Sequence, residues 1–122
     1  MDNLTKLIDG YIAMWNEPDA VLRRELISQT WTEDASYLDP VMNGEGQQGI
    51  DVMVQAVQER FPGHRFVRTS AIDSHHDRVR FTWELAAEGG AAIVKGTDYG
   101  VLAADGRLQN IIGFFDQAPA QS

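Results

Sequence analysis

An aspartate in apolar surroundings, Asp98, is the residue of this sequence whose type and position best suit chemistry. Side chains alternate in the manner of a strand over residues 92–102, and Asp98 shares its face with Ala92, Val94, Gly96, Gly100 and Leu102. Because an apolar wall destabilises a charged carboxyl, we expect a raised pKa and a neutral acid at pH 7 that can donate a hydrogen bond. On a concave face the flanking glycines would leave room for a ligand. The alternative is a solvent-facing strand with Asp98 as an ordinary surface charge.

Two further side chains are candidates for the same site. Tyr11 lies on the apolar stripe of a predicted helix, so its hydroxyl needs either a buried partner or a ligand. Asp39 precedes Pro40, and Asp-Pro commonly starts a turn, so Asp39 is either a turn residue or a site carboxylate. Tyr37 shares a strand face with Asp39.

Other kinds of site have little support in the sequence. There is no cysteine, which excludes a thiolate nucleophile and Cys-ligated metals. His75 and His76 are adjacent, so their side chains diverge, and His64 follows a Pro-Gly turn. No His-x-x-x-His spacing, Walker A motif or Gly-x-Ser-x-Gly is present. We therefore expect neither a metal nor a cofactor.

Helical periodicity predicts three helices that would position these residues. The first has its apolar stripe over residues 4–15, with Asp2 or Asn3 as its cap. A second follows Pro18 and is expected to turn Val21, Leu22 and Leu26 inward. The third has its stripe over residues 50–61 and is stopped by the Pro-Gly that follows.

Alternating patterns predict strands in the rest of the chain. A short strand over 35–40 enters a turn, and 43–46 is expected to be a loop. Further strands are predicted over 65–72, 79–85, 92–102 and 108–116, with turns at 88–90 and 105–106. Helices first and an antiparallel meander afterwards indicate an α+β fold. We expect one domain over residues 1–116 and a flexible tail over 117–122.

Composition limits the partners and the location. The 122 residues include ten Lys and Arg against 18 Asp and Glu, a net charge of −8. Nucleic acid and anionic membranes need a basic surface, so neither is an expected partner. No apolar run approaches the roughly 20 residues of a membrane span, and the start lacks a signal-peptide pattern. We expect a cytoplasmic protein.

The order of these features resembles the NTF2-like α+β cone. That superfamily includes ketosteroid isomerases, SnoaL-type polyketide cyclases and limonene-epoxide hydrolases. The resemblance covers nearly the whole chain, from Leu4 to Asp116. It implies a curved antiparallel sheet wrapped around three helices, with a pocket between the sheet and the first and third helices. It also implies a homodimer formed through the outer face of the sheet.

Within the superfamily the sequence is most similar to the ketosteroid isomerases. Their oxyanion-hole tyrosine precedes Asn by five positions and corresponds to Tyr11. Their base lies in an Asp-Pro-Val segment, which places it on Asp39, and their second oxyanion donor matches Asp98 in Gly-Thr-Asp. The resemblance implies that Asp39 moves a proton beside a ketone while Tyr11 and neutral Asp98 stabilise the enolate.

Several departures keep other functions open. A supporting pocket tyrosine of some isomerases is replaced by Val54, and in SnoaL-type cyclases the aspartate at the Asp98 position acts as the acid or base. One acid of the epoxide-hydrolase relay falls on Gly113.

The expected pocket takes a small apolar ligand and is lined by Trp15, Tyr37, Met53, Val54, Phe81, Trp83 and Phe115. We expect a cofactor-independent isomerase or cyclase. The alternatives are a non-catalytic binding module and an interaction domain whose pocket is filled by Trp15, Trp83 and Phe115.

Overall fold

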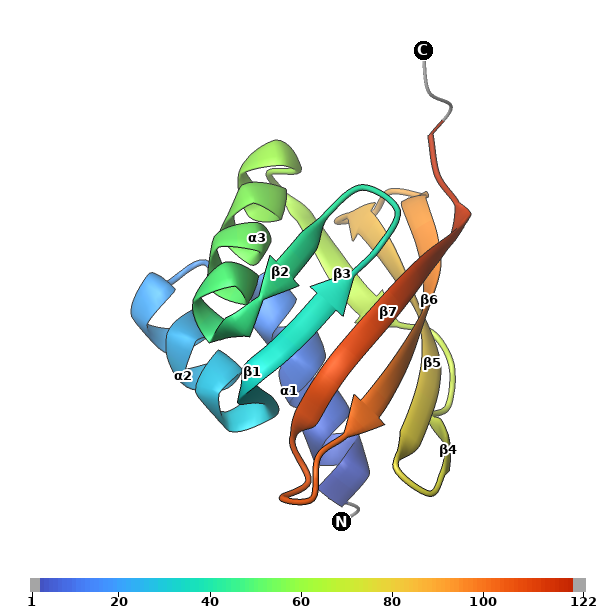
Figure 1. The fold of residues 1–122 in the computed structure, drawn as a ribbon. Coiled ribbons are helices and arrows are strands. Elements are labelled where there is room, and N and C mark those ends of the chain that lie inside the picture. The colour runs from blue at the N-terminus through green and yellow to red at the C-terminus, as the bar shows by residue number, and fades with distance from the viewer. Residues whose placement is uncertain (1–2, 120–122) are drawn as a thin grey trace.

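A strongly curled sheet packs against three helices in the computed structural model, which describes residues 3–119 (Figure 1). The helices are α1 (Asn3–Asn16), α2 (Ala20–Thr30) and α3 (Gly46–Arg60). The strands are β1 (Trp31–Leu38), β2 (Asn43–Glu45), β3 (His64–Arg68), β4 (Asp73–His75), β5 (Arg78–Ala87), β6 (Ala92–Leu102) and β7 (Leu108–Gln117). This architecture confirms the predicted α+β cone.

The three helices form where the apolar periodicity predicts them. The stripe of α1 buries Ile8, Tyr11, Met14 and Trp15, and the stripe of α3 buries Ile50, Met53, Val54 and Val57. Asp19 caps α2, because its carboxylate accepts hydrogen bonds from the backbone N–H groups of Val21 and Leu22 at 2.9 and 3.0 Å. Asp2, one of the two candidate caps of α1, lies outside the described residues.

The sheet is mixed rather than wholly antiparallel. Its order is β2-β1-β7-β6-β5-β3, with β4 paired to β5. All pairs are antiparallel except β1 with β7, which run parallel (Figure 1). The prediction of a purely antiparallel sheet is therefore wrong at this pair. Alternation along a strand shows which residues are buried but not which strand lies beside it.

Smaller differences concern exposed segments. The expected loop over 43–46 contains the short strand β2, and the strand predicted over 65–72 ends at Arg68. All three residues of β4 are exposed, so this strand has no alternation that could predict it. Gln117 is the last residue of β7 rather than the first of a tail, and residues 120–122 lie outside the described part. Within residues 3–119 no helix has the length and apolar character of a membrane span.

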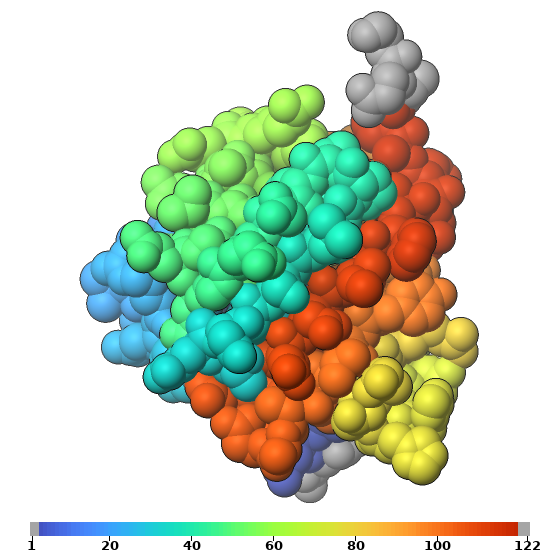
Figure 2. Space-filling model, viewed as in Figure 1, coloured from blue at the N-terminus to red at the C-terminus, as the bar shows by residue number. Residues whose placement is uncertain are grey.

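The inner and outer faces of the sheet differ in composition. On β5 and β6 alternate residues are buried against the helices, among them Phe81, Trp83, Val94 and Asp98. Figure 2 views the molecule from the outer side, where β7 lies beside β1. Candidate site residues on the inner face are therefore enclosed between the sheet and α1 and α3.

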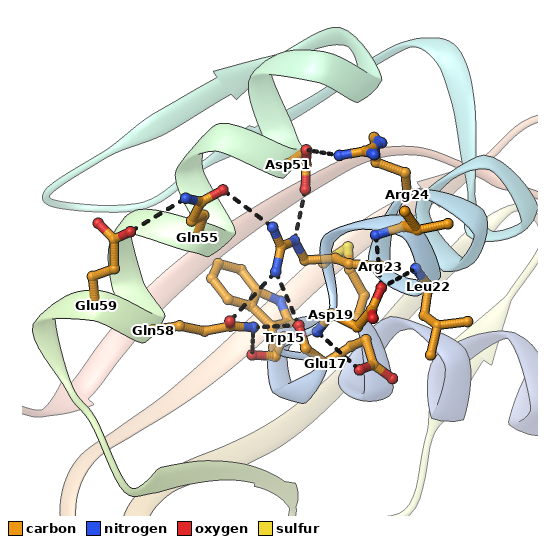
Figure 3. A network of polar contacts seen from close by, with 12 residues as sticks. Trp15, Glu17, Asp19, Leu22, Arg23, Arg24, Asp51, Gln55, Gln58 and Glu59 are labelled. Carbon is orange, nitrogen blue, oxygen red and sulfur yellow. Dashed lines mark hydrogen bonds and ion pairs between the residues drawn. The ribbon is translucent and has the colours of Figure 1, made fainter.

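A buried arginine joins the helices, contrary to the predicted orientation of α2. Val21 and Leu22 are exposed, whereas Arg23 is only 1% exposed. Its Nε donates to Asp51 Oδ1 at 2.6 Å, and Nη1 donates to the Glu17 carbonyl oxygen at 3.0 Å (Figure 3). Nη2 donates to Gln55 Oε1 at 3.2 Å, so the guanidinium links α2 both to α3 and to the α1–α2 connection.

Candidate functional site

Asp98 is enclosed on the inner face of β6, with 2% of its surface exposed. Its Oδ2 accepts a hydrogen bond from the Tyr11 hydroxyl at 2.7 Å, and its Oδ1 accepts one from Trp83 Nε1 at 2.9 Å. The alternative of a solvent-facing Asp98 is thus wrong. Tyr11 comes from α1 and Trp83 from β5, so the carboxyl lies where a helix meets the sheet.

The protonation of Asp98 follows from this environment. Burial raises its pKa from 3.8 to about 6, the hydrogen bonds from Tyr11 and Trp83 lower it, and the nearby charge of Asp39 raises it. The direction agrees with the sequence analysis. A carboxyl with a pKa of about 6 is mostly ionised at pH 7, which favours a carboxylate over the predicted neutral acid. Both partners donate to Asp98, which makes it a hydrogen-bond acceptor.

Asp39 is also largely buried, at 7% exposure, and both of its carboxylate oxygens accept hydrogen bonds. Oδ1 accepts the backbone N–H groups of Val41 and Met42 at 2.9 and 3.0 Å, the pattern of an Asp-Pro turn. Oδ2 accepts the Tyr37 hydroxyl at 2.8 Å. Asp39 therefore shapes the turn after β1 and also places a carboxylate close to Asp98.

Gly113 allows the two acidic groups to approach each other. It lies on β7 opposite Asp98 in the strand register. A Cβ atom there would be 2.9 Å from Asp98 Oδ1, 3.2 Å from the Tyr37 hydroxyl and 3.4 Å from Asp39 Cβ. These groups therefore surround one point on the inner face. Because residue 113 is a glycine, it cannot supply the third acid that an epoxide-hydrolase relay needs at this position.

Both buried tyrosines remain hydrogen-bond donors at neutral pH. Burial is the largest cause that raises the pKa of Tyr11 well above its ordinary value, and the Asp98 charge adds to it. Burial likewise raises the pKa of Tyr37, with Asp98 and Asp39 adding to the effect. Each hydroxyl therefore keeps its proton beside a carboxylate.

The glycines beside Asp98 make room for core side chains rather than for a ligand. A Cβ at Gly96 would lie 2.2 Å from Trp83 Cζ2, and one at Gly100 would lie 2.7 Å from Ile111 Cδ1. The expectation that these glycines leave ligand space is wrong, because an indole and an isoleucine occupy it.

Aromatic rings fill the interior next to the acids. Trp15 contacts Tyr37 and Phe66 with ring centroids 5.4 and 5.1 Å apart. Phe66 contacts Trp83 at 5.4 Å, and Trp83 contacts Phe115 at 6.2 Å. Two depressions, of about 430 and 350 Å³, open on the outside; the larger is lined by Thr97, Tyr99, Phe114 and Asp116.

The remaining predicted lining residues lie around the same interior. Phe81 is buried against Tyr11, with ring centroids 5.7 Å apart, and α3 contributes buried Met53 and Val54. Phe115 is partly exposed. Sequence reasoning missed Phe66, which contacts two of the predicted lining tryptophans, and the role of Gly113. The alternation in β3 was a signal that could have placed Phe66 inward.

The histidines do not form a site with these residues. His64 contacts the Phe61 ring, and His75 and His76 lie on or next to β4. Over residues 3–119 no group of three or more His, Cys, Asp or Glu is arranged to hold a metal ion.

The raised pKa predicts a pH-dependent stability. Because the folded state has the higher pKa, it binds the Asp98 proton more tightly than the unfolded chain does. The contribution of Asp98 to the free energy of unfolding should be greatest below about pH 4 and fall by about 3 kcal/mol as the pH rises through about 6. Urea unfolding of wild type and Asp98→Asn would show this as a change in their difference over that window. A constant difference would contradict the raised pKa.

Comparison with known proteins gives the family. No protein-family model and no curated protein matches the chain. A proposed isomerase of the SnoaL-like family from Agrobacterium tumefaciens str. C58 is 42% identical, with a TM-score of 0.89, covering 95% of this chain and 99% of that one. An NTF2-like protein of unknown function from Cytophaga hutchinsonii ATCC 33406 is 12% identical, with a TM-score of 0.70 and coverages of 95% and 92%.

A third similar structure is a proposed SnoaL-like polyketide cyclase from Jannaschia sp. CCS1. It is 17% identical with a TM-score of 0.68, and covers 95% of this chain and 90% of that one. The two more distant structures share the fold, whereas the Agrobacterium protein is also similar in sequence over nearly its full length. The chain therefore belongs to the SnoaL-like family, and it has the fold of NTF2-like proteins.

Proposed function

We propose that this protein catalyses proton transfer at a carbon beside the carbonyl group of a small apolar molecule, with Asp98 as the group that takes and returns the proton. The observation that carries the proposal is a buried carboxyl with a pKa of about 6, held between Tyr11 and Trp83. A general base works best when its pKa lies near the working pH, and the raised pKa makes Asp98 a stronger base than an ordinary aspartate.

The charge in this reaction moves from Asp98 to the substrate. Ionised Asp98 accepts the carbon-bound proton and becomes neutral, while the electron pair of the broken C–H bond forms an enolate. The Tyr11 hydroxyl then no longer faces a negative carboxylate and can donate to the enolate oxygen. Neutral Asp98 returns its proton to another carbon for isomerisation, or to the same carbon for exchange.

The proton-accepting role goes to Asp98 rather than to Asp39, although the resemblance to ketosteroid isomerases assigns it to Asp39. The Asp39 oxygens accept three hydrogen bonds, two of them from the turn that Asp39 itself shapes. Its negative charge raises the pKa of Asp98. We therefore assign Asp39 the role of supporting the basicity of Asp98.

An apolar carbonyl compound fits the groups around Asp98. The surrounding side chains are aromatic or aliphatic, and the few polar groups converge at Asp98 and Asp39. Phe66 and Phe115, the partly exposed rings beside Trp83, mark the side from which a ligand would approach Asp98. The Agrobacterium and Jannaschia proteins are a proposed isomerase and a proposed polyketide cyclase, and enolate chemistry is compatible with both activities.

Hydrogen exchange in D₂O tests this proposal without knowledge of the natural substrate. The protein would be incubated with cyclic unsaturated ketones of increasing size, and deuterium at the carbons beside the carbonyl followed by NMR. We expect catalysed exchange or double-bond migration with at least one ketone. Binding of these ketones without any exchange would favour the alternative of a non-catalytic binding module.

We also propose that two copies associate through the outer face of the sheet. Leu38, Ile112 and Tyr99 lie side by side across β1, β7 and β6, and Phe114 extends this exposed apolar surface. Light scattering is expected to give the mass of a dimer and, for Phe114→Glu, a shift toward monomer. Val67→Glu, which changes an exposed apolar residue on β3, should leave the mass unchanged. A monomeric wild type would reject the dimer.

A further inference from the structure

We infer that Trp83 is a positioning residue which orients Asp98 and favours its ionised form, and that Gly96 is required because the indole occupies the space of a side chain there. The resemblance to ketosteroid isomerases implies neither role; in the sequence analysis Trp83 is expected only to line the pocket. The inference rests on the proposed function in so far as it concerns a catalytic Asp98.

The strand register explains how the indole reaches Asp98. Trp83 on β5 lies opposite Gly96 on β6, whereas Phe81 lies opposite Asp98. The indole therefore crosses diagonally over Gly96 to place Nε1 at 2.9 Å from Asp98 Oδ1. A Cβ at Gly96 would meet Cζ2 at 2.2 Å and Cε2 at 2.5 Å. Only glycine at this position permits the observed hydrogen bond.

Neighbouring rings keep the indole in this orientation. Phe66 and Phe115 contact it edge-on, with centroids 5.4 and 6.2 Å away and interplanar angles of 62° and 86°. A donor whose rotamer is fixed by packing needs no reorganisation when the charge on its acceptor changes. The packing of Trp83 thus preorganises one side of the carboxyl, while Tyr11 holds the other.

The chemistry of the indole N–H favours ionised Asp98. An indole nitrogen donates and cannot accept, so its bond is strongest to a carboxylate oxygen. The other groups that act on Asp98 are Tyr11 from α1, which favours the ionised form, and Asp39 after β1, which opposes it. The Tyr37 hydroxyl from β1 and Asp98 Oδ1 both lie beside Gly113. The residues that lie opposite Asp98 on the neighbouring strands, Phe81 on β5 and Gly113 on β7, carry no charge. Without the Trp83 N–H, the protonation equilibrium of Asp98 should shift toward the neutral carboxylic acid.

Titration of Asp98 in Trp83→Phe tests the inference without a substrate. With selectively ¹³C-labelled aspartate, the carboxyl midpoint of Asp98 should rise by about one pH unit when the indole N–H is lost. Trp31→Phe is the matched control, because Trp31 is as deeply buried and contacts Tyr11, but its Nε1 donates to Met14 Sδ. It should leave the midpoint unchanged. An unchanged midpoint in Trp83→Phe, or an equal rise in both variants, would overturn the inference.

Gly96→Ala provides a second route to the same result. The added methyl must displace the indole, so the Asp98 midpoint should rise as in Trp83→Phe. Combining the two substitutions should raise it no further, because both remove one hydrogen bond. A further rise in the double variant would overturn the inference.

Activity separates this inference from the proposed function. In Trp83→Phe, the acid limb of the pH–rate profile for ketone exchange should move to higher pH with the Asp98 midpoint. If the midpoint rises but wild type exchanges no ketone, the proposed function fails while the positioning of Asp98 by Trp83 stands. If wild type exchanges ketones but the midpoint does not rise, the inference alone fails.

Discussion

Asp98→Asn is expected to slow proton transfer to a bound ketone by about 10²- to 10⁴-fold, the usual contribution of a general base. An amide of the same shape cannot take up a proton at neutral pH, so the loss follows from chemistry rather than from size. In wild type, kcat/KM should rise with pH through about 6, where Asp98 ionises. Initial rates of deuterium incorporation measure both effects.

Two variants separate the roles of the groups around Asp98. Tyr11→Phe removes the hydroxyl that donates to Asp98, and we expect a smaller loss together with a higher Asp98 pKa. Asp39→Asn removes the charge that raises the Asp98 pKa, so the acid limb of the profile should move to lower pH. If Asp39→Asn abolishes exchange while Asp98→Asn retains it, Asp39 is the base and our assignment is reversed.

Arg23→Ala is expected to lower the free energy of unfolding by about 3 kcal/mol, near the lower end for breaking a buried ion pair. The substitution leaves Asp51, with a side chain only 14% exposed, without its 2.6 Å partner. It also removes the donors that hold Gln55 and the Glu17 carbonyl (Figure 3). The residual exposure of Asp51 limits the loss. Urea denaturation measures it.

Arg24→Ala is the matched control for this effect. Arg24 faces the same aspartate at 3.9 Å, but its side chain is 58% exposed, and exposed pairs contribute less than about 1 kcal/mol. Equal losses in the two variants would show that the buried network has no special role in stability.

The helices and most of the inner face of the sheet could be predicted from the sequence. Periodicities of 3.6 and 2 report burial. They placed Tyr11 on the inward face of its helix and grouped Asp98 with small and apolar residues on one face of its strand, without deciding whether that face is buried. Arg23 shows the limit of this reasoning. A charged side chain is buried in α2 because Asp51 and two glutamines of α3 surround it, and those partners are far away in sequence.

The sequence predicted which residues lie at the candidate site but not how their side chains contact one another. The sequence showed small residues beside Asp98, yet not that Gly96 accommodates an indole from the neighbouring strand. Nor did it show that Trp83 and Tyr11 both donate to Asp98, which changes the expected donor into an acceptor. These features depend on strand register and on the β1–β7 pairing, which brings Tyr37 and Asp39 to Gly113.

The measurement that tests our central claim most directly is the titration of the Asp98 carboxyl by ¹³C NMR in the wild-type protein. Asp98 can serve as the base at neutral pH only if it ionises below about pH 7, and burial should make it a stronger base than an exposed aspartate. Our account predicts a midpoint near 6. A midpoint near 4, typical of an exposed aspartate, would contradict the burial that we assign to this group. A carboxyl that stays protonated above about pH 8 would instead make Asp98 a hydrogen-bond donor and contradict its role as the base.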